Sequence, residues 1–437
     1  MRDTCRGVGY SARQGAIRVS DAPSFMSMSF RFLHAADLHL GSPFLGLAQK
    51  DEDVAARFAK ASRSAFEDLV TKALAEGVSF VVIAGDIFDG EWKDASIALF
   101  LNRQLARLSN RGISTFLLRG NHDAESLVAK SLTLPDNVFE FSTRRPETHR
   151  IKDLRVALHG RGFPHREVVE NYAVDYPGPV AGWFNIGVLH TACGRGGHEN
   201  YAPCTAADLA ARGYDYWALG HVHAFEIVAR DPWIVYPGNL QGRSIRECGE
   251  RGAVLVEVAG GAVTDVRRVM TDSARWAEVF VDATPHGDES GLLRAIEAAV
   301  RAHADAAQGR LLAVRVVLTG ATALHARFVS DRDRLRDEVE AAAQRCGDDI
   351  WLERLRIDTA EPRRSPVVDD ALAEIDLAAA LEKSEADAAV RTRVTELLKV
   401  VRDRLPGGMA EDADAALGLE SILTEARALT LGRSAED

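Results

Sequence analysis

Three short apolar runs in the first third of the chain each stop at a cluster of polar residues. The runs cover residues 30–36, 80–84 and 113–118, and their length and composition are typical of buried strands. They are followed by Asp37 and His39, by Asp86, and by Asn121, His122 and Asp123. Because ligands collect at the carboxyl ends of strands in an α/β sheet, we expect these side chains to meet at one sheet edge.

The segments between these runs have helical periodicity. In residues 53–76, apolar positions recur every three or four residues up to Gly77, and in residues 94–110 they run from a possible N-cap, Asp94, to Gly112. Strand, helix, strand, helix and strand in this order predict the beginning of a parallel sheet.

The middle of the chain alternates strands with loops. Residues 184–190 end on His190, and residues 214–219 run into His221 and His223. The runs 233–236, 253–258 and 262–269 follow with hairpin-like spacing. We therefore expect a second, more antiparallel sheet that packs on the first.

The last part of the chain changes pattern twice. Strand-like runs at 276–281, 311–318 and 351–357 alternate with helical segments at 289–306 and 331–345, which predicts a smaller α+β unit. Residues 359–366 form a Pro- and Arg-containing stretch typical of a linker. Amphipathic helices are then expected at 369–405 and 412–430.

Composition is that of an ordinary globular protein, with 437 residues, 46% hydrophobic and 27% charged. No apolar run is long enough to span a membrane, and residues 1–29, which lack a signal-peptide core, are expected to be a disordered extension. Five scattered cysteines indicate a reducing cytoplasm rather than a disulfide scaffold. Cys193 and Cys204 flank His198 and could bind zinc, although free thiols are the favoured interpretation.

Net charge is −11, but residues 331–437 alone carry −10, so the remainder is nearly neutral. No strongly basic stripe is present, and we do not expect strong unassisted binding to duplex DNA. Histidine nitrogens mixed with carboxylate and amide oxygens favour transition ions such as Mn, Fe or Zn over Ca. Asp86, with two carboxylate oxygens, is the natural bridge between two such ions.

Five motifs occur in a recognisable order: D-x-H (Asp37, His39), G-D-x-x-D (residues 85–89), G-N-H-D (120–123), a strand-end His190, and G-H-x-H (220–223). This order resembles that of the calcineurin-like metallophosphoesterases. Residues 134–138, 145–148, 201–204 and 237–243 further resemble the DNA-repair exonuclease branch, which includes the nuclease subunit of the bacterial SbcCD complex and the YhaO-type exonucleases. The resemblance covers about residues 30–270.

The resemblance implies an α/β fold, a four-layer α-β-β-α sandwich over residues 30–275. It also implies a DNA-recognising α+β capping domain at 276–358, and a linker and helical tail at 359–437. Carried over by motif, Asp37, His39 and His223 hold one Mn ion, Asn121, His190 and His221 hold a second, and Asp86 is shared. His122 would act as general acid, oriented by Asp123; the alternative is that His122 and Asp123 only buttress the loop. Asp89 departs from the histidine that is typical of double-strand-break nucleases, which leaves its phosphate contacts open.

Several other residues keep two interpretations. His159 lies beside the metal ligands or is structural. Arg195, His198, Tyr201, Arg243 and Arg246 contact substrate or sit in solvated loops, and Phe44 and Trp92 stack on bases or pack internally.

The function that the resemblance implies is a Mn-dependent DNA exonuclease in repair, cytoplasmic and with no membrane partner. The helical tail would bind a coiled-coil ATPase of the chromosome-maintenance type, and a homodimer is compatible. The alternatives are a phosphodiesterase or phosphatase on a small or nucleotide substrate, and a DNA-end scaffold with weak hydrolysis. For the tail, packing on its own chain is the competing interpretation.

Overall fold

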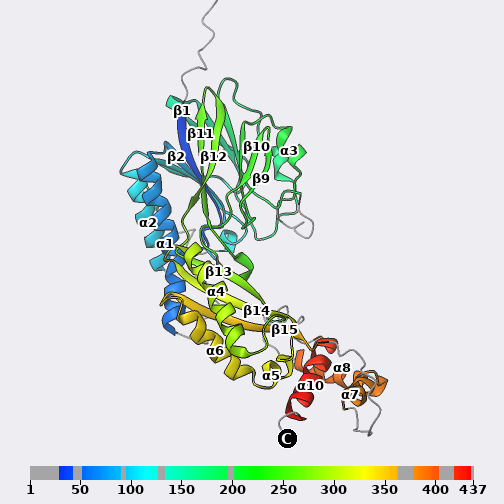
Figure 1. Cartoon of the computed structure of the whole chain (residues 1–437). Coiled ribbons are helices and arrows are strands. Elements are labelled where there is room, and N and C mark those ends of the chain that lie inside the picture. Colours follow the sequence, from blue (N-terminus) through cyan, green and yellow to red (C-terminus); the bar gives the residue numbers. More distant parts are fainter. Residues whose placement is uncertain are drawn as a thin grey trace, which may run out of the picture.

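The computed structural model describes residues 29–42, 52–89, 95–125, 133–194, 201–362, 377–402 and 418–434. They form two six-stranded sheets and one three-stranded sheet, connected mainly by helices (Figure 1). The α/β class expected from the sequence is confirmed. No helix among the residues described is both long and apolar enough to cross a membrane.

The first sheet has the strand order β12-β11-β1-β2-β3-β4. Its strands are β1 (Ser29–Ala35), β2 (Phe80–Ala84), β3 (Ser114–Leu118), β4 (Val138–Glu140), β11 (Gly252–Ala259) and β12 (Ala262–Met270). Strands β1 to β4 pair in parallel, as the alternation of strands and helices predicts. The crossovers are helices α1 (Glu52–Glu76) and α2 (Ala95–Ser109), and the N-cap expected at Asp94 lies outside the described residues.

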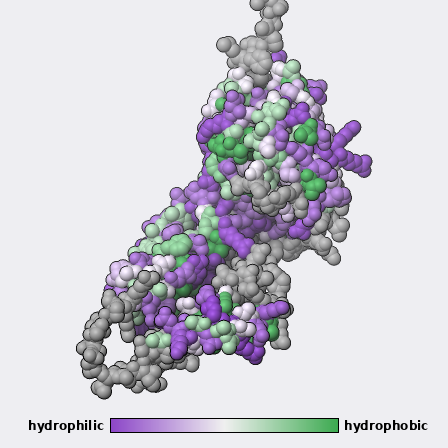
Figure 2. All heavy atoms as spheres, turned by 90° about the vertical axis from the view of Figure 1, so that its right-hand side faces the viewer, coloured by the Kyte–Doolittle hydropathy of each residue, from purple (hydrophilic) through white to green (hydrophobic). Residues whose placement is uncertain are grey.

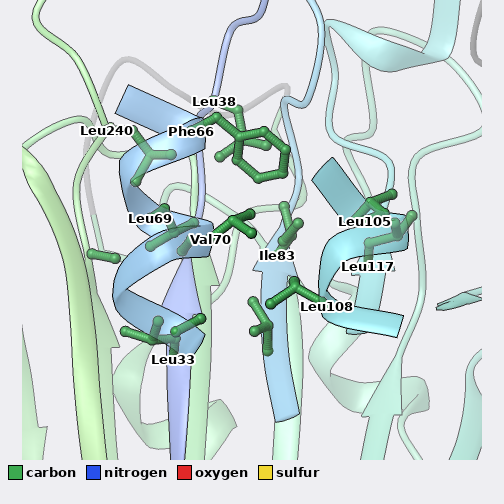
Figure 3. Packing of buried hydrophobic residues seen from close by; sticks show 14 of the residues in the cluster. Leu33, Leu38, Phe66, Leu69, Val70, Ile83, Leu105, Leu108, Leu117 and Leu240 are labelled. Carbon is green, nitrogen blue, oxygen red and sulfur yellow. The ribbon is translucent and has the colours of Figure 1, made fainter. Parts of the chain in front are cut away.

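Helices α1 and α2 cover the outer face of this sheet (Figure 3). Phe66, Leu69 and Val70 of α1 and Leu105 and Leu108 of α2 pack against strand residues such as Leu33, Ile83 and Leu117. At roughly 1.5–3 kcal/mol for each large apolar side chain removed from water, this cluster fixes the strands whose ends carry the polar motifs.

The second sheet has the order β5-β6-β7-β8-β10-β9. Its strands are β5 (Glu147–Ile151), β6 (Val156–Gly160), β7 (Phe184–His190), β8 (Tyr216–Gly220), β9 (Glu226–Arg230) and β10 (Trp233–Tyr236). It packs face to face on the first sheet through phenylalanines of both, including Phe32, Phe80 and Phe184. Its outer face is covered by the short helix α3 (Ala206–Ala210) and by loops.

The expectation of a more antiparallel second sheet is wrong. Three of its five strand pairings are parallel, the same number as in the first sheet. The hairpin β11–β12 belongs instead to the first sheet, where β11 pairs with β1. The physical reason is that β11 is apolar on both faces, with Leu255 toward the helices and Val254 and Val256 toward the second sheet, so it is stable only between two layers.

Residues 274–360 form a separate three-stranded unit with all strands parallel. Its elements are β13 (Ala274–Asp282), α4 (Glu289–Ala307), β14 (Leu311–Ala321), α5 (His325–Ser330), α6 (Arg332–Gln344) and β15 (Ile350–Ala360). Apolar residues of the helices cover one face of the sheet, and the start of the other face packs on α1 through Phe58 and Trp276. Figure 1 shows α1 running from the first sheet down to this unit.

The helical tail differs from the two helices expected. Its described helices are α7 (Leu377–Glu385), α8 (Ala388–Arg402) and α10 (Leu419–Ser434). The predicted helix 369–405 is interrupted because the Asp387 carboxylate accepts hydrogen bonds from the amides of Ala389 and Val390, at 2.7 and 3.3 Å, and so caps α8. Strand β15 also continues to Ala360, into the stretch expected to be linker. Helix α10 packs against α5.

Candidate metal centre

The polar motifs converge at the carboxyl ends of five parallel strands. Asp37 and His39 follow β1, Asp86 follows β2, Asn121 follows β3, His190 ends β7, and His221 and His223 follow β8. Backbone hydrogen bonds join the first two loops, from the amide of Asp37 to the carbonyl of Gly85 and from that of His39 to the carbonyl of Asp86, each 3.0 Å. Residues far apart in the sequence are thereby held at one edge between the two sheets.

Three groups of side chains bring their ligand atoms within 4.8 Å of one another. They are Asp37, His39 and His223; His39, Asp86 and His122; and Asp37, Asp86 and His190. Asp86 belongs to two of the groups, with its Oδ2 3.3 Å from His190 Nε2 and 3.9 Å from His39 Nε2. A carboxylate in this position can bridge two ions.

The two remaining predicted ligands lie beside His190. Asn121 Oδ1 is 2.9 Å from His190 Nε2, and the ring of His221 is 5.2 Å from that of His190, measured between centroids. The backbone amide of His221 also donates to both oxygens of Asp37, at 3.1 Å. The structure therefore brings together all seven residues that the sequence singled out as ligands.

The backbone at this edge is strained, and its loops pack closely on one another. Asp37, His39, Asp86 and His221 all have positive φ, between 42° and 96°, which non-glycine residues rarely adopt. Such conformations cost about 1–3 kcal/mol each and concentrate at functional sites. The motif glycines are equally constrained: a Cβ on Gly220 would lie 1.9 Å from the carbonyl oxygen of Ala84.

Burial and mutual charge shift the ionisation of these groups. Burial raises the pKa of Asp37 to about 6, although the charges of His223 and His190 oppose the shift. Burial also opposes a charge on His190, but the charge of Asp86 and its hydrogen bond outweigh it and raise the pKa of His190 to about 9. His39 is the reverse case, because burial lowers its pKa to about 4.

This donor set fits divalent transition ions. His39 Nε2 and His223 Nε2 are 3.2 Å apart, close to the roughly 3 Å expected for two nitrogens that each lie about 2.1 Å from one ion. Buried carboxylates at Asp37 and Asp86 supply negative charge that such ions would neutralise. Imidazole, carboxylate and amide donors together suit Mn, Fe or Zn.

His122 has a different partner from the one expected. Its Nδ1 lies 3.0 Å from Asp89 Oδ1, and the hydrogen bond to Asp89 raises the pKa of His122 against the effect of burial. Its side chain is 30% exposed, whereas that of Asp86 is 2% exposed. The general-acid candidate therefore lies at the open side of the centre, with Asp89 as its orienting carboxylate.

Asp123 does not orient His122, so that part of the prediction is wrong. Its carboxylate accepts hydrogen bonds from the backbone amides of Ile87, Phe88 and Gly120, at 3.0, 2.8 and 2.9 Å. It thus joins the loop after β2 to the loop after β3. Burial and the nearby charge of Asp86 raise the pKa of Asp123 to about 7.

Two charged residues beside the centre come from the segment after β10. Arg243 Nη1 lies 3.3 Å from Asp89 Oδ2. The side chain of this arginine is therefore located beside the centre and not in a solvated loop. Glu247, in the short helix η5 (Ile245–Glu247), accepts from His223 Nδ1 at 2.7 Å. The sequence analysis did not single out Glu247, because no motif marks a residue 24 positions after its partner.

The structure gives different locations for the other candidate residues. His159 hydrogen-bonds Thr148 and Asn185 and stacks on Tyr214, which supports the structural interpretation. The ring of Tyr201 lies 4.6 Å from that of His221, and Arg246 is exposed. Cys193 and Cys204 are buried free thiols. The remaining candidates, Phe44, Trp92, Arg195 and His198, lie outside the described residues.

Comparisons with known proteins agree with this geometry. Residues 30–225 match the calcineurin-like phosphoesterase family, and residues 276–360 match the middle domain of metallophosphoesterase YhaO. The uncharacterized metallophosphoesterase YhaO of Bacillus subtilis is 36% identical over 277 residues, covering 62% of this chain and 68% of the relative.

More distant relatives are DNA double-strand break repair proteins named Mre11. That of Methanopyrus kandleri is 25% identical over 367 residues, covering 77% of this chain and 74% of the relative. That of Halobacterium salinarum is 27% identical over 414 residues, covering 88% of this chain and 96% of the relative. The similarity to this group thus extends beyond the residues of the metal centre.

Proposed function

The chain belongs to the calcineurin-like metallophosphoesterases, which hydrolyse phosphoesters with divalent metal ions, and we propose that it is a Mn-dependent DNA exonuclease in DNA repair. The names of its Mre11 relatives support the role in DNA repair.

Two ions are assigned to the centre in this proposal. Asp37, His39 and His223 would hold one, Asn121, His190 and His221 would hold the other, and Asp86 would be shared by both. When bound, such ions polarise the phosphoryl oxygens and lower the pKa of the attacking water.

The protein's own acid in this reaction is His122. Asp89 accepts from Nδ1 of the imidazolium, so the proton given to the leaving oxygen comes from Nε2. Against the effect of burial, hydrogen bonds from His122 and His39 lower the pKa of Asp89, and Arg243, 3.3 Å from its second oxygen, helps to hold the carboxylate in place. In place of the histidine that is typical of double-strand-break nucleases, Asp89 thus supplies a carboxylate that raises the pKa of His122.

The observation that carries the choice of DNA is the open face of the three-stranded sheet. Phe280 is 61% exposed there, and strand pairing places it in one row with the buried Val317 and with the exposed Arg356, which is paired with Asp358. The start of β13 contacts the segment that carries Arg243 and Glu247, since Trp276 Nε1 donates to the carbonyl of Gly242, and Phe280 lies four residues, roughly 13 Å, further along. An exposed aromatic ring can stack on a base, and an arginine two strand spacings away, about 10 Å, can contact a phosphate of the same DNA strand.

The test compares Mn-dependent cleavage of end-labelled DNA with cleavage of bis-p-nitrophenyl phosphate. Replacing Phe280 and Arg356 together by Ala should lower DNA cleavage by about tenfold or more, since one stacked base is worth roughly 1–3 kcal/mol. Cleavage of the small diester should not change. The control, Arg301→Ala, removes an exposed arginine from α4, which packs on the covered side of the sheet.

The two alternative functions predict other results. Hydrolysis of small diesters without any DNA cleavage would favour a small-substrate phosphodiesterase. Tight binding of DNA ends with only weak hydrolysis would favour a DNA-end scaffold.

A protein partner is proposed for helix α8. Val390, Leu397 and Val400 lie on one side of this helix and are 37%, 52% and 50% exposed, although α7 and α10 both contact α8. The face of the molecule in Figure 2 is otherwise mainly hydrophilic, with small separate hydrophobic patches. We assign this stripe to the coiled coil of a chromosome-maintenance-type ATPase.

Leu397→Glu should abolish capture of this ATPase in a pull-down, whereas Lys399→Glu, on the opposite side of α8, should not. Equal capture by both variants would exclude the stripe as the binding surface.

A further inference from the structure

The segment 242–249 connects a predicted metal ligand with the three-stranded unit. Glu247 lies at its centre, and its side chain is 12% exposed. One carboxylate oxygen, Oε1, is 2.7 Å from His223 Nδ1. The other, Oε2, accepts from the amide of Arg243 at 2.7 Å and from Asn239 Nδ2 at 2.9 Å. The carboxylate is therefore held in one orientation from both sides.

This contact decides which nitrogen of His223 carries the proton. A carboxylate only accepts hydrogen bonds, so the proton lies on Nδ1 and the lone pair lies on Nε2. Nε2 points to the centre, 3.2 Å from His39 Nε2 and 4.0 Å from Asp37 Oδ1. Arg243 Nη2 also approaches Nδ1, but at 3.4 Å, and it lies 3.3 Å from Glu247 Oε1, so it acts on the carboxylate.

His223 needs such a restraint more than the buried ligands His39 and His190 do. Its side chain is 28% exposed, whereas those of His39 and His190 are 1% and 0% exposed and are fixed by packing. A partly exposed ring can rotate and exchange tautomers, and each departure from the Nδ1–H form removes the ligand nitrogen from the centre.

A single residue of the three-stranded unit fixes both ends of the segment. Trp276 Nε1 donates to the carbonyl of Gly242 at 3.0 Å, and the amide of Gly249 donates to the carbonyl of Trp276, also at 3.0 Å. Trp276 is itself buried, with its ring 5.1 Å from that of Phe58 on α1. A Cβ at Gly242 would lie 2.6 Å from the carbonyl oxygen of Glu247, so the turn is closely packed.

We infer that Glu247 is a positioning residue that presents His223 Nε2 to the ion at Asp37 and His39, and that Trp276 couples the three-stranded unit to this ion by holding Glu247 in place. The inference rests on the metal centre of the proposed function but not on the choice of DNA as substrate. It also assigns the unit a task at the centre that is separate from substrate recognition.

The test is calorimetric titration of the metal-free full-length protein with MnCl2. Glu247→Ala should weaken one of the two sites by about 10- to 100-fold, the usual effect of removing a carboxylate behind a metal-binding histidine, and leave the other unchanged. Trp276→Phe keeps an aromatic ring, smaller than the indole, and removes the Nε1–H donor, so it should weaken the same site by roughly threefold to tenfold. Glu250→Gln, three residues away and 48% exposed, is the matched control and should bind as the wild type does.

Thermal melts without and with MnCl2 separate positioning from a structural role. Glu247→Ala leaves the amide of Arg243 and Asn239 Nδ2 without their acceptor, so its metal-free protein should melt below the wild type. The inference expects, in addition, a smaller rise in its melting temperature than in that of the wild type when MnCl2 is added. Wild-type affinity at both sites in this variant would overturn the inference. So would an equal loss at both sites. A wild-type protein that takes up no Mn would overturn the metal centre itself, and Glu247's role with it.

Discussion

Replacement of Asp123 should unfold the junction between two metal-binding loops rather than remove a catalytic group. Its carboxylate accepts three backbone hydrogen bonds: Oδ2 from Ile87 and Gly120, and Oδ1 from Phe88. Asp123 is 1% exposed, so water does not readily replace these bonds. Each buried amide left without an acceptor costs about 1–3 kcal/mol.

Two variants should therefore form a graded series. Asp123→Asn can keep the two bonds to one oxygen, but places an amide group against the Phe88 amide, so we expect a loss of about 1–3 kcal/mol in the free energy of unfolding. Asp123→Ala loses all three bonds, and we expect a loss of about 3–5 kcal/mol after some entry of water into the space. Urea denaturation of the metal-free proteins measures both values.

Activity then decides between the structural and the catalytic role. Because Asp123 holds the loops of Asp86 and Asn121 together, metal affinity should fall in the same order as stability. A variant with wild-type stability and metal affinity but slower turnover would refute this reasoning and make Asp123 catalytic. His122→Ala serves as the contrast, because it removes one side-chain bond to Asp89 and leaves the backbone amides of Ile87, Phe88 and Gly120 bonded to Asp123.

Three further predictions concern single residues. Asp86→Asn should abolish Mn-dependent cleavage of bis-p-nitrophenyl phosphate and lower the metal content, because Asp86 is shared by two ligand groups; undiminished hydrolysis would exclude bridging. His122→Ala should keep both ions and lower turnover by about 10²-fold; metal content that falls in step with activity would instead make His122 a ligand. His34 is buried against Tyr216 and the carbonyl of Leu219, and burial lowers its pKa to about 3, so its neutral form stabilises the fold above pH 6.5 and this stability is lost as the pH falls toward 3. The share lost at pH 5 is about 2 kcal/mol, and His34→Gln should reduce the difference in unfolding free energy between pH 7 and pH 5 by that amount; an unchanged difference would contradict the lowered pKa.

Local sequence patterns indicated the central strands and the candidate ligand residues. Apolar runs that end in Asp, Asn or His are local patterns, and the alternation with helices made β1, β2 and β3 parallel neighbours whose ends meet. Local patterns also predicted the ends of α1 and α2 to within one residue. The apolar stripe of each helix lies inside it, and a glycine follows its last turn.

The hydrogen-bond partners of these residues could be seen only in the tertiary structure. Asp89, and not Asp123, contacts His122, because the carboxylate of Asp123 accepts hydrogen bonds from backbone amides up to 36 residues away. Glu247 accepts a hydrogen bond from His223, which is 24 residues away in the sequence. The hairpin β11–β12 joined the first sheet for a similar reason, since both of its faces found apolar layers only there. Hydrogen-bond partners and sheet membership depend on surfaces contributed by distant segments, and the free energy of burying those surfaces has no counterpart in the local spacing of residues.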